Sequence, residues 1–133
     1  MIRIKSTLLA CVGWTFVLAA IPGDLRAQDV KRTELQRHDL TGTNMEVVVS
    51  IVEAAPGASL AKHFHHGEEA FYVLSGTMVE YAGQPATERA TGSSGINVRE
   101  VPHAGYKVVG DKPLKLLTVH VIDKGKPMQE LVK

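Results

Sequence analysis

The chain has 133 residues, with 15 Lys and Arg against 14 Asp and Glu and a single cysteine. This length suits one domain, because two domains sharing it would each have an under-filled core. The near-neutral charge lacks the basic excess that nucleic-acid binding usually requires, so we expect no nucleic-acid partner.

The first 27 residues have the pattern of a secretory signal peptide. Arg3 and Lys5 precede an apolar run over residues 8–21, and Ala27 stands at a plausible cleavage point. The run is shorter than the ~20 residues of a spanning helix, which argues against a retained anchor. Lipid attachment at Cys11 would come too early in the run. We therefore expect cleavage near Ala27, a secreted or periplasmic protein, and no stable membrane span after cleavage.

Cleavage at this point changes which chemistry is available. It removes the only cysteine and four charged residues, so Lys plus Arg falls from 15 to 12 and Asp plus Glu from 14 to 13, a net charge near −1. Without a thiol, the mature chain cannot form a disulfide framework, a cysteine-ligated metal site or a cysteine nucleophile. An extracytoplasmic protein of small-molecule or metal chemistry is the class that remains.

Residues 28–45 are polar and of mixed charge, and we interpret them as an N-terminal arm with at most one short strand, able to dock on a partner subunit. The domain proper is expected over residues 46–133. Its first segment, residues 46–53, is rich in β-branched residues and is followed by the turn former Pro56-Gly57, as is typical of a buried strand.

The rest of the chain also predicts strands. A hairpin is expected around Ser75-Gly76, whereas residues 83–95 are a turn-rich connection with at most one weak edge strand. The further expected strands are residues 70–74, 77–81, 96–101 and 114–122. No amphipathic helix or internal repeat is evident, so the pattern predicts an all-β sandwich or barrel.

Three of the six histidines lie in one short segment, His63-Phe64-His65-His66-Gly67-Glu68-Glu69. In a strand, residues two apart point to the same face, so His63 and His65 would direct their imidazoles together. A carboxylate from the next strand would complete a set of two histidines and one carboxylate, the pattern of non-haem Fe(II) sites. The alternative is a solvated, histidine-rich turn.

Glu69 is a better candidate for this carboxylate than Glu68. Glu69 shares the face of Phe71 and Val73 in an extended strand, whereas Glu68 falls on the opposite face. His66 is out of phase with His65, and we expect it to be exposed on the turn.

The spacing Gly57, five residues, His63, Phe64, His65, three residues, Glu69, six residues, Gly76 resembles the first motif of the cupin family at every fixed position. The resemblance covers about residues 46–122. It implies a double-stranded β-helix, the jelly-roll cupin barrel, with His63, His65 and Glu69 as metal ligands.

The family's second motif supplies a fourth ligand, a histidine, and His103 fits that role. His103 lies 11 residues after Gly92, which is the family's spacing. The motif departs from the family at Val98 and Glu100, where proline and glycine are common, and at Lys107, where asparagine is common. These departures affect the expected loop geometry and the transfer of any substrate contact.

The resemblance implies one divalent transition metal per chain. Imidazole and carboxylate ligands suit Fe, Mn, Ni, Cu, Co and Zn alike. Four protein ligands on an octahedral ion leave two positions for water, dioxygen or substrate. The family also implies a homodimer paired through edge strands, which would cover those edges.

Two further residues are candidates to assist catalysis. His120 lies in the apolar segment 114–122 and is either an acid or base near the metal or a hydrogen-bonded core histidine. Tyr106, three residues after His103, is expected near the pocket mouth.

The leading functional hypothesis is a metal-dependent oxidoreductase of dioxygenase type that acts on a small oxygenated organic substrate. The alternatives are a non-catalytic module that binds a metal or a small ligand, and a metal-assisted isomerase or lyase.

Overall fold

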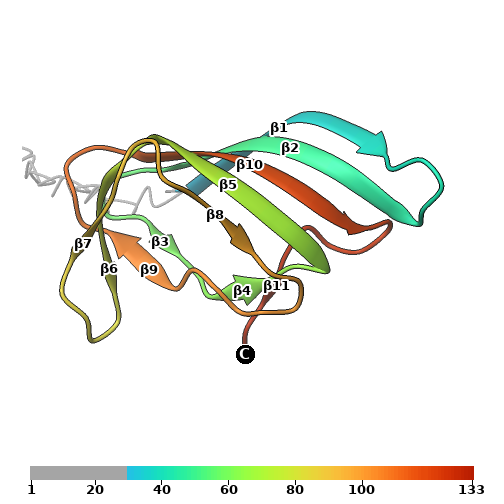
Figure 1. Ribbon diagram of the computed structural model, residues 1–133. Coiled ribbons are helices and arrows are strands. Elements are labelled where there is room, and N and C mark those ends of the chain that lie inside the picture. The colour runs from blue at the N-terminus through green and yellow to red at the C-terminus, as the bar shows by residue number, and fades with distance from the viewer. Residues whose placement is uncertain (1–29) are drawn as a thin grey trace, which may run out of the picture.

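A computed structural model describes residues 30–133, which form eleven β-strands and no α-helix (Figure 1). The predicted signal peptide lies outside the described residues. The strands are β1 (Val30–Asp39), β2 (Met45–Ala54), β3 (Ser59–Leu60), β4 (His63–Phe64), β5 (Gly67–Ser75), β6 (Thr77–Tyr81), β7 (Thr87–Arg89), β8 (Ser94–Asn97), β9 (Tyr106–Val108), β10 (Leu114–Asp123) and β11 (Glu130–Leu131). Within residues 30–133 no helix is long and apolar enough to cross a membrane.

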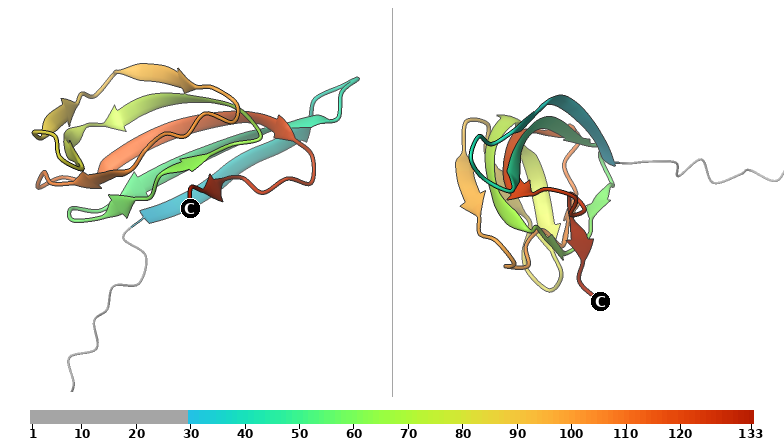
Figure 2. Two further views of the ribbon diagram at one scale, coloured as in Figure 1. Left: turned by 90° about the horizontal axis from the view of Figure 1, so that it is seen from below. Right: turned by 90° about the vertical axis from the view of Figure 1, so that its right-hand side faces the viewer.

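The strands form two main antiparallel sheets. The larger has the order β1-β2-β10-β5-β8, the smaller has the order β3-β9-β6-β7, and β11 pairs with β4. Viewed from one end, the sheets curve around a common interior (Figure 2). The predicted all-β barrel is therefore confirmed.

The two central long strands show why the sequence folds this way. Residues of β2 and β10 alternate between buried and half-buried positions along their whole length, as expected for a strand that lines a core with one face. Their inward side chains include Val48 and Val52 of β2 and Leu114 and Leu116 of β10, all buried. Polar Ser50 also lies inward, on the part of the interior that holds the functional site.

The segment expected to be an arm is part of the main sheet. Strand β1 is ten residues long and pairs with β2 from Val30 opposite Ala54 to Asp39 opposite Glu46. Most of its side chains are exposed, and only Val30 and Arg32 are partly buried. Polar composition concealed this strand, because an edge strand with one solvated face needs few apolar residues.

The prediction of a hairpin around Ser75-Gly76 is wrong. Strand β5 pairs with β10 and β8, whereas β6 pairs with β7 and β9, so the two strands belong to different sheets. Gly76 is the corner between the sheets. A Cβ atom added there would lie 2.3 Å from the Arg89 carbonyl oxygen and 2.5 Å from the Thr91 nitrogen. Close backbone approach, and not a tight turn, explains this glycine.

Replacing Gly76 with alanine is expected to lower the free energy of unfolding by about 1–3 kcal/mol, because backbone atoms must move to admit the methyl group. Urea denaturation followed by circular dichroism measures this change. The Ser75→Ala variant is the control and should differ from the parent by less than about 0.5 kcal/mol. Equal stability of the two variants would contradict the corner assignment.

Candidate metal centre

The histidine-rich segment enters the interior between two sheet elements. His63 lies in β4, His65 follows that strand, and Glu69 lies in β5; all three side chains are buried. Gly67 allows the chain to pass close to β10, since a Cβ atom there would lie 2.0 Å from the Val121 carbonyl oxygen. The predicted phase is confirmed, because Glu69 points inward and Glu68 is exposed.

Glu69 is the middle of a polar row across the larger sheet. In the strand register it lies opposite His120 of β10 on one side and Asn97 of β8 on the other. His120 Nε2 lies 3.2 Å from Glu69 Oε1, and Asn97 Nδ2 donates a hydrogen bond of 2.6 Å to Glu69 Oε2. Strand pairing thus fixes both partners of the carboxylate.

His103 reaches the same place from an irregular segment. It forms an isolated β-bridge with His63 through reciprocal backbone hydrogen bonds of 2.8 and 3.1 Å, and Glu100 N donates to the His65 carbonyl oxygen at 3.0 Å. Two residues beside it, Glu100 and Ala104, have φ angles of 59° and 60°. Glycine adopts this left-handed conformation most easily, which agrees with the glycine that the similar motif commonly has where this chain has Glu100.

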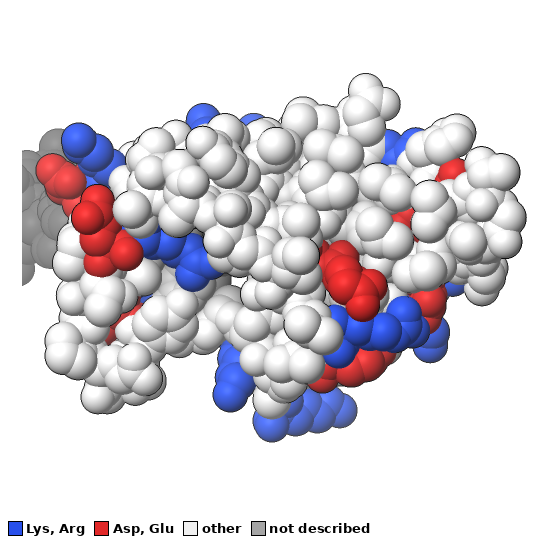
Figure 3. Space-filling model, in the orientation of Figure 1, with Lys and Arg blue, Asp and Glu red and all other residues white. Residues whose placement is uncertain are grey.

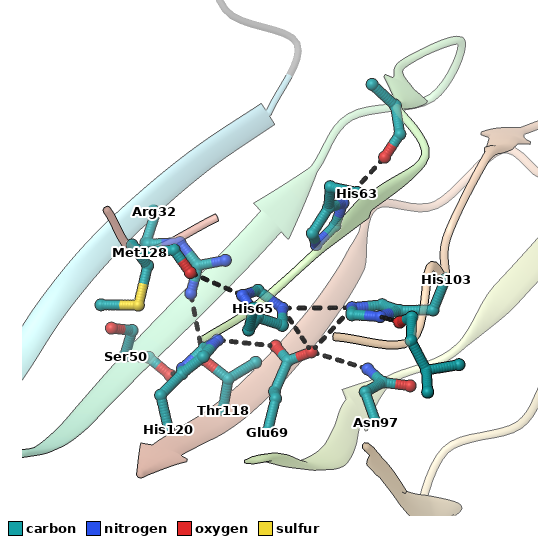
Figure 4. A network of polar contacts seen from close by, with 12 residues as sticks. Arg32, Ser50, His63, His65, Glu69, Asn97, His103, Thr118, His120 and Met128 are labelled. Atoms are coloured by element: carbon teal, nitrogen blue, oxygen red, sulfur yellow. Dashed lines mark hydrogen bonds and ion pairs between the residues drawn. The ribbon is translucent and has the colours of Figure 1, made fainter. Parts of the chain in front are cut away.

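Three of the predicted ligands meet at close range (Figure 4). His65 Nε2 lies 3.1 Å from His103 Nε2, and Glu69 Oε2 lies 3.2 Å from the former and 3.3 Å from the latter. The ligand atoms of His63, His65 and His103 all lie within 4.8 Å of one another. The four residues predicted from the sequence are therefore neighbours.

Backbone carbonyls orient these imidazoles. The Nδ1 atoms of His63, His65 and His103 contact the carbonyl oxygens of Ala61 at 2.8 Å, Met128 at 2.5 Å and Val101 at 3.0 Å, respectively. A carbonyl can only accept, so each Nδ1 carries the proton and each Nε2 of a neutral ring presents a lone pair. Two such lone pairs face each other 3.1 Å apart in His65 and His103, an arrangement that fits a cation.

The charge states of Glu69, His63 and His120 also suit a divalent cation. Burial alone would raise the pKa of Glu69, but its contacts with His103, His120 and His65 outweigh burial and hold that pKa well below its usual range. Burial lowers the pKa of His63 and of His120, so both rings are neutral at neutral pH. Burial would also lower the pKa of His103, but Glu69 and the Val101 carbonyl raise it overall.

A second set of possible ligands overlaps the first. His65, Glu69 and His120 also offer ligand atoms within 4.8 Å of one another. The two carboxylate oxygens distinguish the sets, because Oε2 faces His65 and His103 whereas Oε1 faces His120. His120 is wholly buried, and neither ring nitrogen makes a well-aligned hydrogen bond within residues 30–133, although Nε2 is within ion-pair distance of Glu69.

A cavity of about 110 Å³ opens beside these ligands. Glu69, His63 and His103 form part of its wall, and Tyr106 forms another part. Burial raises the pKa of Tyr106 to about 12, so the phenol keeps its proton at neutral pH. Tyr106 is thus buried in the cavity wall, and not at the surface, while still facing the site.

Four other residues near the site were not among the predicted functional residues. Asn97 occupies an inward position of β8, and Arg32 and Arg89 line the cavity together with Tyr81. Asn97 and Tyr81 had a signal in the sequence, because both lie in predicted strands. The arginines come from segments that were interpreted as a solvated arm and a turn-rich connection.

His66 is not exposed as expected. Only 13% of its side chain is accessible, because its Nδ1 contacts Glu100 Oε1 at 2.7 Å and its Nε2 contacts Glu130 Oε1 at 2.8 Å. These contacts join Glu100, three residues before His103, to β11 through the His66 ring. His38 of β1 is exposed.

The His65→Ala variant is expected to retain less than a tenth of the transition metal bound by the parent chain, because it removes the ring shared by both ligand sets. Elemental analysis of protein purified without chelators or affinity-tag metal measures this loss. The His38→Ala variant is the control and should match the parent. Full metal retention by His65→Ala would refute the ligand assignment.

Comparisons with known proteins agree with this fold. No protein of curated function matches the chain. Among solved structures, a conserved Klebsiella pneumoniae protein with a double-stranded β-helix domain aligns with a TM-score of 0.59 and 22% identity over 80% of this chain and 86% of that one. The polyketide cyclase RemF from Streptomyces resistomycificus gives 0.58 and 24% over 80% and 72%.

The DMSP lyase DddQ from Ruegeria pomeroyi aligns with a TM-score of 0.51 and 20% identity, covering 65% of this chain and 43% of that one. At these identities the likeness shows the fold alone, which is the predicted double-stranded β-helix. The family model for the cupin domain matches residues 50–120, more than half of the chain, and the protein therefore belongs to the cupin family.

Proposed function

We propose that this cupin is a metal-dependent oxidoreductase of dioxygenase type that acts on a small oxygenated organic substrate. One observation carries the proposal. The Nε2 atoms of His65 and His103 and Glu69 Oε2 lie 3.1–3.3 Å from one another in pairs, and His103 and Glu69 also line a cavity of about 110 Å³. A metal held there would face the space in which a substrate binds.

The proposed ligands are His63, His65, Glu69 and His103, and they would hold one divalent transition metal. A set of imidazoles and one carboxylate suits Fe(II) and its neighbours in the first row. When bound, such an ion supplies Lewis-acid activation and, where it is Fe, electron transfer to dioxygen.

Residues outside the ligand set prepare the site. Asn97 holds the Glu69 carboxylate by a hydrogen bond, and His120 lies against its other oxygen at 3.2 Å. Tyr106 keeps its proton at Oη and can donate a hydrogen bond to a substrate oxygen. Phe71 and Leu116 form apolar parts of the cavity wall, which limits the water around the reacting groups.

A metal-assisted lyase or isomerase is the second candidate. The protonated Tyr106 phenol lines the cavity, and the buried, neutral His120 ring lies 3.2 Å from Glu69. Such groups can move a proton without dioxygen. The solved cupins that resemble this chain include a polyketide cyclase and a DMSP lyase. A non-catalytic metal-binding module would use the same ligands and no turnover.

Oxygen consumption separates these functions. Metal-loaded protein is expected to consume dioxygen with at least one member of a panel of diketones, phenols and small acids, and His65→Ala to consume none. Tyr106→Phe and His120→Asn should keep their metal and lose about tenfold or more in rate. Conversion of a substrate without oxygen uptake would favour the lyase, and stoichiometric metal without any conversion would favour the binding module.

We further propose that the mature chain is exported and forms a homodimer. The signal-peptide pattern of residues 1–27 supports export. Exposed Tyr72, Leu74 and Ile96 on the outward side of β5 and β8 support pairing, because large apolar side chains grouped at a sheet edge favour association. N-terminal sequencing should find Gln28 as the first residue, and an intact Met1 would contradict the proposed export. Light scattering should give twice the monomer mass, and a monomer would contradict the proposed dimer.

A further inference from the structure

Two guanidinium groups line the cavity beside the proposed metal ligands. Arg32 comes from β1 and Arg89 from β7, so the two approach from different sheets. Neither forms an ion pair with a carboxylate of residues 30–133; Arg32 Nη1 donates instead to Thr118 Oγ1 at 3.3 Å, and Arg89 Nη1 to Tyr81 Oη at 3.3 Å. The cavity wall therefore contains two guanidinium groups that form no ion pair within residues 30–133.

Aromatic rings hold the Arg89 guanidinium in place. Its central carbon lies 4.7 Å from the centre of the Phe71 ring and 5.3 Å from that of the Tyr106 ring. Arg89 Nε is buried and has no hydrogen-bond partner within residues 30–133. A guanidinium fixed in this way has lost most of its freedom before a ligand arrives, which favours binding of a planar anion.

The charge balance of the cavity wall favours an anion. Its acidic residue is Glu69, whose oxygens already face three imidazoles and an amide. The Arg32 and Arg89 guanidinium groups outnumber this carboxylate even without a metal. A divalent ion on the proposed ligands would raise the positive charge further.

Shape and lining specify the kind of anion. A cavity of about 110 Å³ is slightly smaller than the ~150 Å³ that accommodates benzene. An adjoining cavity of about 390 Å³ shares Arg32, Val52, Leu60 and His63 with it. Apolar side chains line part of both cavities. Inorganic phosphate would make no favourable contacts with them. Figure 3 shows Lys and Arg atoms beside a hollow on one face of the molecule. Asp and Glu atoms also occur on this face. A small organic acid with an apolar remainder fits these features.

We propose that the substrate or ligand is a small organic carboxylate, and that Arg32 and Arg89 bind its charge. The inference rests on the proposed function, because it concerns the same cavity, and it names a substrate class for that site. The arginines are specificity-determining residues, and the metal ligands are separate from them.

Calorimetric titration with butanoate and with its neutral analogue butanamide tests the proposal. Metal-loaded parent protein is expected to bind butanoate at least about tenfold more tightly than butanamide. Arg89→Gln and Arg32→Gln should each reduce that ratio by about tenfold, and Arg89→Lys should restore part of it. The control is Arg37→Gln, which removes an arginine of β1 that does not line the cavity and pairs with Glu34.

Metal content measured on the same samples separates the two proposals. Equal affinity for butanoate and butanamide in the parent protein would overturn the inference without the use of any variant. The same conclusion follows if both glutamine variants keep the parent ratio along with their metal and their folded circular dichroism spectrum. Binding of butanoate by a protein that takes up no metal would support the arginine assignment and contradict the proposed metalloenzyme.

Discussion

Removing a carboxylate from water is costly unless charged or hydrogen-bonding partners surround it, and Glu69 is only 6% exposed. Its neighbours come from four separate places in the chain: His65 before β5, Asn97 on β8, His103 between β8 and β9, and His120 on β10. Asn97 donates a hydrogen bond to the carboxylate, and a cation shared with the surrounding imidazoles would compensate its charge. The register of β10, β5 and β8 and the attachment of the His103 segment are therefore tied to one side chain.

The C-terminal segment is part of the same construction. The Met128 carbonyl accepts the Nδ1 proton of His65, and β11 pairs with β4 so that Leu131 lies opposite His63. His66, next in sequence to His65, contacts Glu130 on β11. The last residues of the chain thus orient an imidazole of the site, although they lie more than sixty residues from it in sequence.

The cavity lining contains two kinds of side chain. One consists of imidazoles and the Glu69 carboxylate, whose lone pairs and charge suit a cation. The other contains Arg32, Arg89 and the ring of Tyr106, which suit a small anion with an apolar body. A site that contains both kinds of side chain can bring a metal and an acid substrate together, and this is the physical basis of both proposals.

The sequence by itself determined the inward phase of Glu69 and the shared direction of His63 and His65, because strand periodicity is a local property. The cupin fold and the place of His103 followed from the resemblance of the motif spacings to the family. Only the tertiary structure decided that Gly76 is a corner between sheets, that β1 joins the main sheet, and that Asn97, Arg32 and Arg89 belong to the site. These facts depend on which strands pair and on the register between them, and such long-range pairings leave no periodic signal in the segments involved. His120 lies between the two cases, since its strand and its face could be predicted but its contact with Glu69 required the register of β10 on β5.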